Sequence, residues 1–168
     1  YAFGAKMLEG IAPLAERDNV PFFSAEMDGS FASKYSTTFM FINDIGEFSR
    51  VMLAGIRERG YKKFLLIKNE NQFHNTWVNG IIKNTKEGET AIDYLSVLPS
   101  TTDFRTNLLK LKKEKFDALG LFLLPGTQRA LVSQLSAFKL QYPLFGGDCV
   151  SFKEENKGYY HVVEGALT

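Results

Sequence analysis

The amino-acid sequence predicts an α/β fold, a three-layer sandwich with a mainly parallel sheet. Short apolar runs alternate with segments of helical periodicity along most of the chain, and such alternation requires crossover connections between parallel strands. The apolar runs are continuous, as in strands that are buried on both faces. With 168 residues, 45% of them hydrophobic, the chain is long enough to bury the core that this fold needs.

The first quarter of the chain predicts one helix and two strands. Residues 4–17 have helical periodicity, although Pro13 weakens or kinks that helix. The apolar runs 20–25 (VPFFSA) and 38–42 (TFMFI) are interpreted as strands, and the polar stretch 26–37 between them as a loop. The apolar face of the helix is predicted to consist of Met7, Leu8, Ile11, Leu14 and Ala15.

The middle of the chain predicts a regular series of helices and strands. Helices are expected at 45–60, 73–84, 101–116 and 126–140, and strands at 62–68, 91–98 and 117–124. The first of these helices is expected to end at Gly60. Its buried face is predicted to consist of Phe48, Val51, Met52 and Ile56.

The last part of the chain predicts a strand within 142–150 (YPLFGGDCV) and another at 158–163 (GYYHVV). The first of them ends on two glycines and Asp148. Ligands of open parallel sheets bind at the carboxyl ends of the strands. Glycines there let the backbone approach a ligand, and a carboxylate there holds a cation or an ammonium group. The alternative is that Asp148 ends the strand by hydrogen bonding to its own turn.

The composition argues against several classes of function. Lys plus Arg (20) and Asp plus Glu (19) nearly balance, so the chain lacks the electrostatic signature of nucleic-acid or membrane-surface binding. No apolar run reaches the length of a membrane span, and the first ten residues lack the basic start and the apolar core of a signal peptide. Cys149 is the only cysteine, which excludes an internal disulfide.

Enzyme signatures are largely absent. The sequence contains no dinucleotide-binding glycine motif, phosphate-binding loop or zinc-protease motif, and we expect no catalytic residue, metal or cofactor. Cys149 and His161 are conceivable as a nucleophile and its base, but a lone cysteine after a strand is more often a small buried hydrophobe. Asp103 and Asp117 are conceivable as paired carboxylates, but one is better explained as a helix cap and the other as the start of a strand.

Four stretches in series resemble the type I periplasmic binding proteins, specifically the branched-chain amino acid receptors. They are IAPLAERDNVPFFSA, FINDIGEFSRVMLAGIRERGYKKFLLIKNENQF, STTDFRTNLLKLKKEKFDALGLFL and YPLFGGD, and they cover roughly residues 9–150. The resemblance implies two α/β lobes that close on a small solute. It implies that residues 1–43 are the end of lobe 1, that residues 44–150 are most of lobe 2, and that residues 151–168 return toward lobe 1.

The resemblance also assigns ligand-binding roles to three residues of the first lobe and the crossover. Ser24 and Ala25 match the residues that hold the ligand carboxylate, by side chain and by backbone N–H. Asp44 lies near the position of an acid that helps to hold the ligand ammonium group. The alternatives are that Ser24 and Ala25 are ordinary residues at the end of a strand and that Asp44 is only a helix N-cap.

The second lobe supplies the other ligand-binding residues implied by the resemblance. Phe73 matches an aromatic residue, usually Tyr, that stacks on the ligand, and Leu124 or Pro125 matches a residue that lines the pocket. Asp148 matches the acid that binds the ligand ammonium group in the cleft between the lobes. The alternative for Phe73 is that it is only a core residue, because aromatic residues four positions apart usually indicate packing.

Solute binding without catalysis is therefore the expected function, in the periplasm or outside the cell. The implied partners are an amino-acid-like small molecule and a membrane permease of the ABC transporter type, or a signalling partner. Because family members are considerably longer, the chain is expected to be a fragment whose exposed lobe edges favour a homodimer. Two alternatives remain: a truncated chain that self-associates and binds no ligand, and an α/β enzyme or signalling domain.

Overall fold

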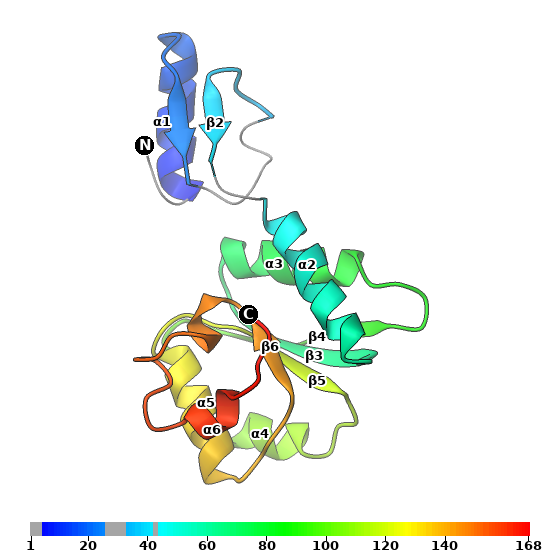
Figure 1. Ribbon diagram of the computed structural model, residues 1–168. Coiled ribbons are helices and arrows are strands. Elements are labelled where there is room, and N and C mark those ends of the chain that lie inside the picture. Colours follow the sequence, from blue (N-terminus) through cyan, green and yellow to red (C-terminus); the bar gives the residue numbers. More distant parts are fainter. Residues whose placement is uncertain (1–4, 26–32, 42–43) are drawn as a thin grey trace. The chain divides into compact units, whose positions relative to one another are not determined.

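The computed structural model describes residues 5–25, 33–41 and 44–168, without the side chains of residues 5–8. The chain divides into two compact units, residues 1–48 and 49–168, and Figure 1 shows their helices and strands. Within the described residues, none of the helices is long and apolar enough to cross a membrane. Mixed helices and parallel strands confirm the predicted fold class.

The first unit is one helix, α1 (Ala5–Arg17), beside two parallel strands, β1 (Phe22–Ser24) and β2 (Thr38–Met40). The Glu16 carboxylate ties the helix to the segment before β2, because it accepts hydrogen bonds from the backbone N–H and the hydroxyl of Thr37. Parts of the loop expected at 26–37 and the end of the strand expected at 38–42 lie outside the described residues.

The predicted apolar face of α1 is wrong in part. Ile11 and Leu14 are 37% and 50% exposed, whereas Ala12 is fully buried and packs with Phe22. A small side chain lets the helix approach a sheet of only two strands, which is too narrow to cover a wide apolar face. Ala15 lies at the border of this small core, as predicted, and Met7 and Leu8 lie outside the described side chains.

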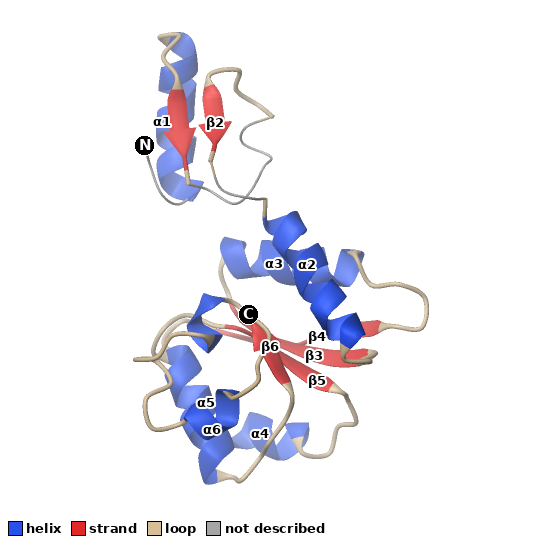
Figure 2. Ribbon diagram, viewed as in Figure 1, coloured by secondary structure: helices blue, strands red, loops and turns tan. Residues whose placement is uncertain are grey.

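The second unit contains a four-stranded parallel sheet in the order β4-β3-β5-β6. Helices α2 and α3 cover one face of this sheet, and α4, α5 and α6 cover the other (Figure 2). The strands are β3 (Lys63–Asn69), β4 (Thr90–Val97), β5 (Ala118–Phe122) and β6 (Leu144–Gly146). The helices are α2 (Ile45–Glu58), α3 (Gln72–Lys83), α4 (Arg105–Leu111), α5 (Thr127–Ala137), the single 3-10 turn η1 (Asp148–Val150) and α6 (Tyr160–Val163).

The central strands are buried on both faces, as their continuous apolar sequences predict. Leu65 and Leu119 belong to the core that α4 and α5 cover. Side chains alternate between the two faces along a strand, so Phe64 points to the face opposite to Leu65. There it packs edge-to-face on Phe145, with ring centroids 5.8 Å apart. The alternation places one buried layer on each side of the sheet, so the sheet is a rigid support for the residues that follow its strands.

The predicted buried face of α2 is displaced around the helix. Met52 and Ile56 are buried as expected, but Phe48 and Val51 are 39% and 71% exposed. The buried face also contains Ser49, which is fully buried and donates a hydrogen bond to the carbonyl of Trp77. Because one residue of the buried face is polar, the hydrophobic pattern alone predicted the wrong side of the helix as buried.

The strand predicted at 158–163 is wrong. Tyr160–Val163 form the short helix α6, in which Val162 is buried. The strand-like contact occurs later, where Leu167 forms a parallel bridge with Phe145. Residues 151–168 lie in the second unit. The aromatic and β-branched residues of this segment favour a strand. In the structure the segment packs against α5 as a helical turn instead.

Candidate functional site

Three residues with predicted ligand-binding roles follow three neighbouring strands of the second unit. Phe73 lies in the first turn of α3 after β3, Leu124 follows β5, and Asp148 follows β6. Because β3, β5 and β6 pair in parallel, their carboxyl ends form one edge of the sheet, which we call the carboxyl edge. The structure therefore brings these three residues to the same edge, as predicted for a binding site.

The carboxylate of Asp148 is exposed and makes no hydrogen bond or ion pair among the residues that the structure describes. Its turn is closed by the backbone instead. The Asp148 carbonyl accepts from the backbone N–H of Ser151 at 3.0 Å and from the Ser151 hydroxyl at 2.7 Å. The alternative that Asp148 merely bonds its own turn thus does not account for its side chain.

The two glycines before Asp148 differ in the space that is available for a side chain. A Cβ atom on Gly146 would lie 2.1 Å from the carbonyl oxygen of Leu121, so the close approach of β6 to β5 excludes any side chain there. A Cβ atom on Gly147 would lie 3.4 Å from a ring carbon of Trp77, an ordinary contact. The first glycine is required by the sheet, whereas the second lies over an aromatic ring at the carboxyl edge.

An aromatic cluster supports this edge. Phe73 is half-buried and packs edge-to-face on Trp77, with centroids 5.6 Å apart, and Trp77 packs on Phe122 with centroids 5.3 Å apart. The ring of Phe73 is packed on the cluster, as the core alternative predicts, and it is still partly exposed, so its role of stacking on a ligand stays a prediction. Trp77 is buried and forms the platform under Phe73 and beside Gly147.

A helix cap holds Phe73 in place and removes one charge from the edge. Asn71 is the N-cap of α3, and its side-chain oxygen accepts from the backbone N–H of His74 at 2.8 Å. Its side-chain nitrogen lies 2.9 Å from Nδ1 of the same His74, which therefore accepts that bond as a neutral imidazole. Burial lowers the pKa of His74 to about 4, so this side chain is uncharged near neutral pH.

Leu124 is 38% exposed, and a buried amide holds its backbone. The N–H of Leu124 donates to Oδ1 of Asn69 at 2.6 Å, and Nδ2 of Asn69 donates to the carbonyl of Val97 at 3.2 Å. Asn69 is not among the residues predicted from the sequence. A polar residue at the buried end of a largely apolar strand is the signal that points to it.

The basic residue nearest the end of β3 already has an acidic partner. Lys68 is 7% exposed, and its ammonium group lies 2.5 Å from a carboxylate oxygen of Asp93 on β4. Glu155 accepts hydrogen bonds from the backbone N–H groups of Gly126 and Arg129 at the start of α5. The carboxyl edge thus offers an apolar surface and the exposed acidic groups of Asp148 and of Glu70, which directly follows β3.

The first unit and the crossover carry the remaining predicted residues. Ser24 is fully buried at the end of β1, and its carbonyl accepts from the N–H of Phe41, while Ala25 is half-buried. Asp44 precedes α2, and its carboxylate accepts from the N–H of Gly46 at 2.7 Å. This is the geometry of an N-cap, so the capping role of Asp44 is seen and a ligand role stays a prediction.

The conceivable enzyme pairs do not form. His161 contacts the hydroxyl of Ser136 at 3.0 Å, and burial raises the pKa of the Cys149 thiol to about 11, which leaves it a poor nucleophile. Asp103 pairs with Arg105 at 2.6 Å. Across the described part of the chain, His, Cys, Asp and Glu side chains do not gather in threes that could hold a metal ion.

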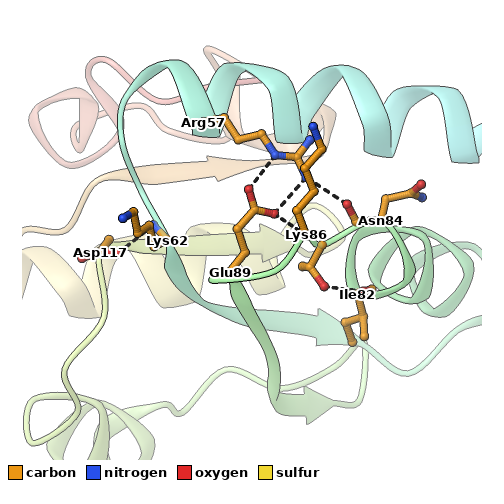
Figure 3. Close-up of polar contacts among 8 residues, drawn as sticks. Arg57, Lys62, Ile82, Asn84, Lys86, Glu89 and Asp117 are labelled. Carbon is orange, nitrogen blue, oxygen red and sulfur yellow. Dashed lines mark hydrogen bonds and ion pairs between the residues drawn. The ribbon is translucent and has the colours of Figure 1, made fainter.

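The opposite edge of the sheet, the amino edge, holds paired charges (Figure 3). Arg57 forms two hydrogen bonds with the Glu89 carboxylate, at 2.6 and 2.8 Å, and one with the carbonyl of Asn84. The Asp117 carboxylate accepts from the backbone N–H groups of Lys62 and Lys63, both at 2.8 Å. A pocket of about 180 Å³ lies here, but the carboxylates of this ion pair and of Asp117 already have partners within the fold.

Comparison with known proteins identifies the family. The family model described as "Periplasmic binding protein" matches residues 2–153. No curated protein sequence is similar enough to the chain to count as a match. The resemblance inferred from the sequence stretches is therefore confirmed at the level of the family.

Solved structures share the fold at low sequence identity. The leucine-binding protein LivK of Thermotoga maritima is 14% identical, with a TM-score of 0.77 over 94% of this chain and 47% of that chain. An ABC transporter solute-binding protein of Rhodopseudomonas palustris in complex with p-hydroxybenzoic acid is 14% identical, with a TM-score of 0.76 over 93% and 45%. LivJ of Streptococcus pneumoniae in complex with isoleucine is 17% identical, with a TM-score of 0.73 over 94% and 46%.

The chain thus spans a little under half the length of these solved chains, 45–47%. The family match covers most of the chain, and the parallel sheet with helices on both faces agrees with it. The chain belongs to the periplasmic binding protein family and has the fold of its type I members.

Proposed function

We propose that the full-length protein is the solute-binding component of an ABC-type importer, or a sensing receptor, and that it binds a small amino-acid-like ligand without catalysis. The observation that carries this proposal is the Asp148 carboxylate, which lies at the carboxyl edge without a polar partner among the described residues. A carboxylate that contributes no bond to the fold is suited to a ligand that brings the opposite charge.

The surroundings of Asp148 support an ammonium group attached to an apolar body. Phe73 and Leu124 present partly exposed apolar side chains at the same edge. Lys68 is paired with Asp93 and His74 is neutral, so neither offers a free positive charge to an acidic ligand. In the proposed complex Asp148 holds the ammonium group, Phe73 packs beside the ligand, and Ser24, Ala25 and Asp44 contribute from the other lobe.

A second candidate ligand is an aromatic carboxylic acid. Phe73 has no hydroxyl and rests on Trp77 and Phe122, a stack that suits a flat ring. The solved protein from Rhodopseudomonas palustris was crystallised with p-hydroxybenzoic acid. An acid of this kind has no ammonium group for Asp148, which is why we place it second.

The proposal extends to location and partners. The full-length protein acts in the periplasm or outside the cell and delivers its ligand to a membrane permease. The chain by itself has a surface suited to self-association, because Phe23 and Phe39 are 54% and 48% exposed and stack with centroids 5.5 Å apart on the two-stranded sheet. Light scattering at high concentration tests this, and a clean monomer contradicts it.

The test of the proposed function uses the full-length protein. A panel of L-amino acids, benzoate and 4-hydroxybenzoate is screened by thermal shift, and affinities are measured by calorimetry. We expect an amino acid to bind and Asp148→Asn to weaken it by about 2–5 kcal/mol, as for a charged pair that loses one partner. The unfolding free energy of this variant should stay within about 0.5 kcal/mol.

Asp117→Asn is the matched control, because it removes a carboxylate of the same type from the amino edge. Its ligand affinity should equal that of the unchanged protein. Equal binding of an amino acid by Asp148→Asn means that the assigned role of Asp148 is wrong. Binding of benzoates alone means that the amino-acid class is wrong, whereas the receptor function stands.

A further inference from the structure

Asn69 joins the carboxyl ends of three neighbouring strands through one side chain. It is the last residue of β3, the strand that lies between β4 and β5, and it is fully buried. Its Nδ2 donates to the carbonyl of Val97, the last residue of β4, and its Oδ1 accepts from the N–H of Leu124, just after β5. Both polar atoms of the amide are therefore used.

The bond to Leu124 replaces a missing rung of the sheet. The regular pairing of β3 with β5 ends at Lys68 and Phe122, so the N–H of Leu124 has no strand partner. A backbone N–H that loses its partner at a partly buried position destabilises the fold. The Asn69 amide supplies that partner at 2.6 Å and so holds the backbone of Leu124 where the strand has already ended.

The same bond determines how Leu124 can meet a ligand. Its N–H is occupied by Asn69 and the next residue, Pro125, has no N–H. Leu124 therefore offers its side chain, which is 38% exposed, rather than a hydrogen-bond donor. Where this side chain lies depends on the backbone that Asn69 holds.

We propose that Asn69 is a positioning residue that determines which apolar part of a ligand the site accepts, by holding Leu124 at the carboxyl edge. The inference rests on the proposed function and deepens it. Asp148 binds the ammonium group that every amino acid shares, whereas Leu124, held by Asn69, contacts the part in which amino acids differ. Asn69 itself, being fully buried, does not touch the ligand.

The test is a double-mutant cycle in the full-length protein, with L-leucine and L-alanine as probes. Asn69→Leu keeps the branched shape of the side chain and removes both hydrogen bonds, and Leu124→Ala removes the side chain that Asn69 is said to position. We expect Asn69→Leu to lower the ratio of leucine to alanine affinity by about tenfold, the factor that one hydrogen bond is worth. In the Leu124→Ala background the same change should alter that ratio less than twofold.

A merely structural role predicts a different result, because general loosening lowers both affinities equally in both backgrounds. Unfolding free energies are measured for every variant, and Asn69→Ser, which is polar but too short to reach both partners, replaces Asn69→Leu if that variant does not fold. An unchanged affinity ratio, or an equal change in the Leu124→Ala background, overturns the inference.

The outcomes also separate this inference from the proposed function. If Asp148→Asn lowers the affinity for leucine but Asn69→Leu does not change the ratio of leucine to alanine affinity, the proposed function stands and the proposed role of Asn69 is wrong. If neither amino acid binds the unchanged protein, the proposed function is overturned and this inference with it.

Discussion

The carboxylates of Glu89 and Asp117 at the amino edge and that of Asp148 at the carboxyl edge differ in their partners within the fold. At the amino edge, Glu89 binds Arg57 at 2.6 Å and Asp117 accepts two backbone N–H groups at 2.8 Å. At the carboxyl edge, the Asp148 side chain has no such partner among the described residues. All three carboxylates lie just outside a strand of the same sheet, Glu89 before β4, Asp117 before β5 and Asp148 after β6.

The difference separates residues that stabilise the fold from residues that are available to a ligand. The Arg57 guanidinium lowers the pKa of Glu89 to about 2, and the N–H groups of Lys63 and Lys62 lower the pKa of Asp117. A lowered pKa means that the folded state favours the charged carboxylate. Asp148 gives no such bond to the fold, so its side chain is available to the ligand that we propose.

The largest expected effect distinguishes the two glycines of the carboxyl edge. Gly146→Ala places a methyl group 2.1 Å from the carbonyl oxygen of Leu121, and β5 and β6 must separate to admit it. We expect a loss of about 3 kcal/mol in the free energy of unfolding, as for overpacking against rigid backbone. Urea unfolding of the full-length protein measures it.

Gly147→Ala is the matched control for this prediction. Its methyl group meets the Trp77 ring at an ordinary distance, and its backbone, with φ of −73°, suits alanine. The free energy of unfolding should change by less than about 0.5 kcal/mol. Equal losses in the two variants contradict the view that only the first glycine is required by the sheet.

The fold was predictable from sequence because its signals are local. Continuous apolar runs mark β3 and β5, and they are buried as predicted. The predictions fail where a distant contact decides. Ser49 is buried because it reaches the carbonyl of Trp77, 28 positions away, and Tyr160–Val163 is a helix because it packs on α5.

The candidate site was predictable in part for the same reason. Asp148 and Phe73 follow strands, and the carboxyl ends of parallel strands meet, so position along the chain is enough to place them. Asn69 escapes such reasoning, because its partners lie 28 and 55 positions away. Whether the side chain of Asp44 caps a helix or meets a ligand likewise depends on geometry that the sequence does not contain.

A medium effect is expected on acidification, at the carboxyl edge. His74 has a pKa of about 4 in the folded protein and about 6.5 when unfolded. The folded state therefore binds the proton less well than the unfolded state. The contribution of neutral His74 to the free energy of unfolding is fully present above pH 6.5 and is lost as the pH falls toward 4. At pH 5 the loss is about 2 kcal/mol.

The measurement compares the unchanged protein with His74→Gln, whose side chain still offers Asn71 an acceptor but does not titrate. The difference in unfolding free energy between pH 7 and pH 5 should be larger for the unchanged protein by about 2 kcal/mol. The same pH dependence in both proteins means that the imidazole stays accessible to protons in the folded state.

The smallest of these effects concerns the amino edge, and it tests the comparison most directly. Glu89→Gln keeps an acceptor for Arg57 and for the N–H of Lys86 but removes the charge, so about 1–2 kcal/mol of unfolding free energy should be lost at pH 7. Because Glu89 has its pKa lowered to about 2, its contribution is present above pH 4.5 and disappears as the pH falls through 2. The variant and the unchanged protein should therefore converge in stability toward that pH.

Ligand affinity decides what the Glu89 result means. Calorimetry at pH 7 should give the same dissociation constant for Glu89→Gln and the unchanged protein, because the pair with Arg57 serves the fold. If Glu89→Gln lowers the ligand affinity while the free energy of unfolding stays unchanged, the binding role belongs to the amino-edge pocket that Arg57 and Glu89 line. In that case a carboxylate that is paired within the fold can also bind the ligand. The absence of a partner for the Asp148 side chain then no longer indicates a binding site.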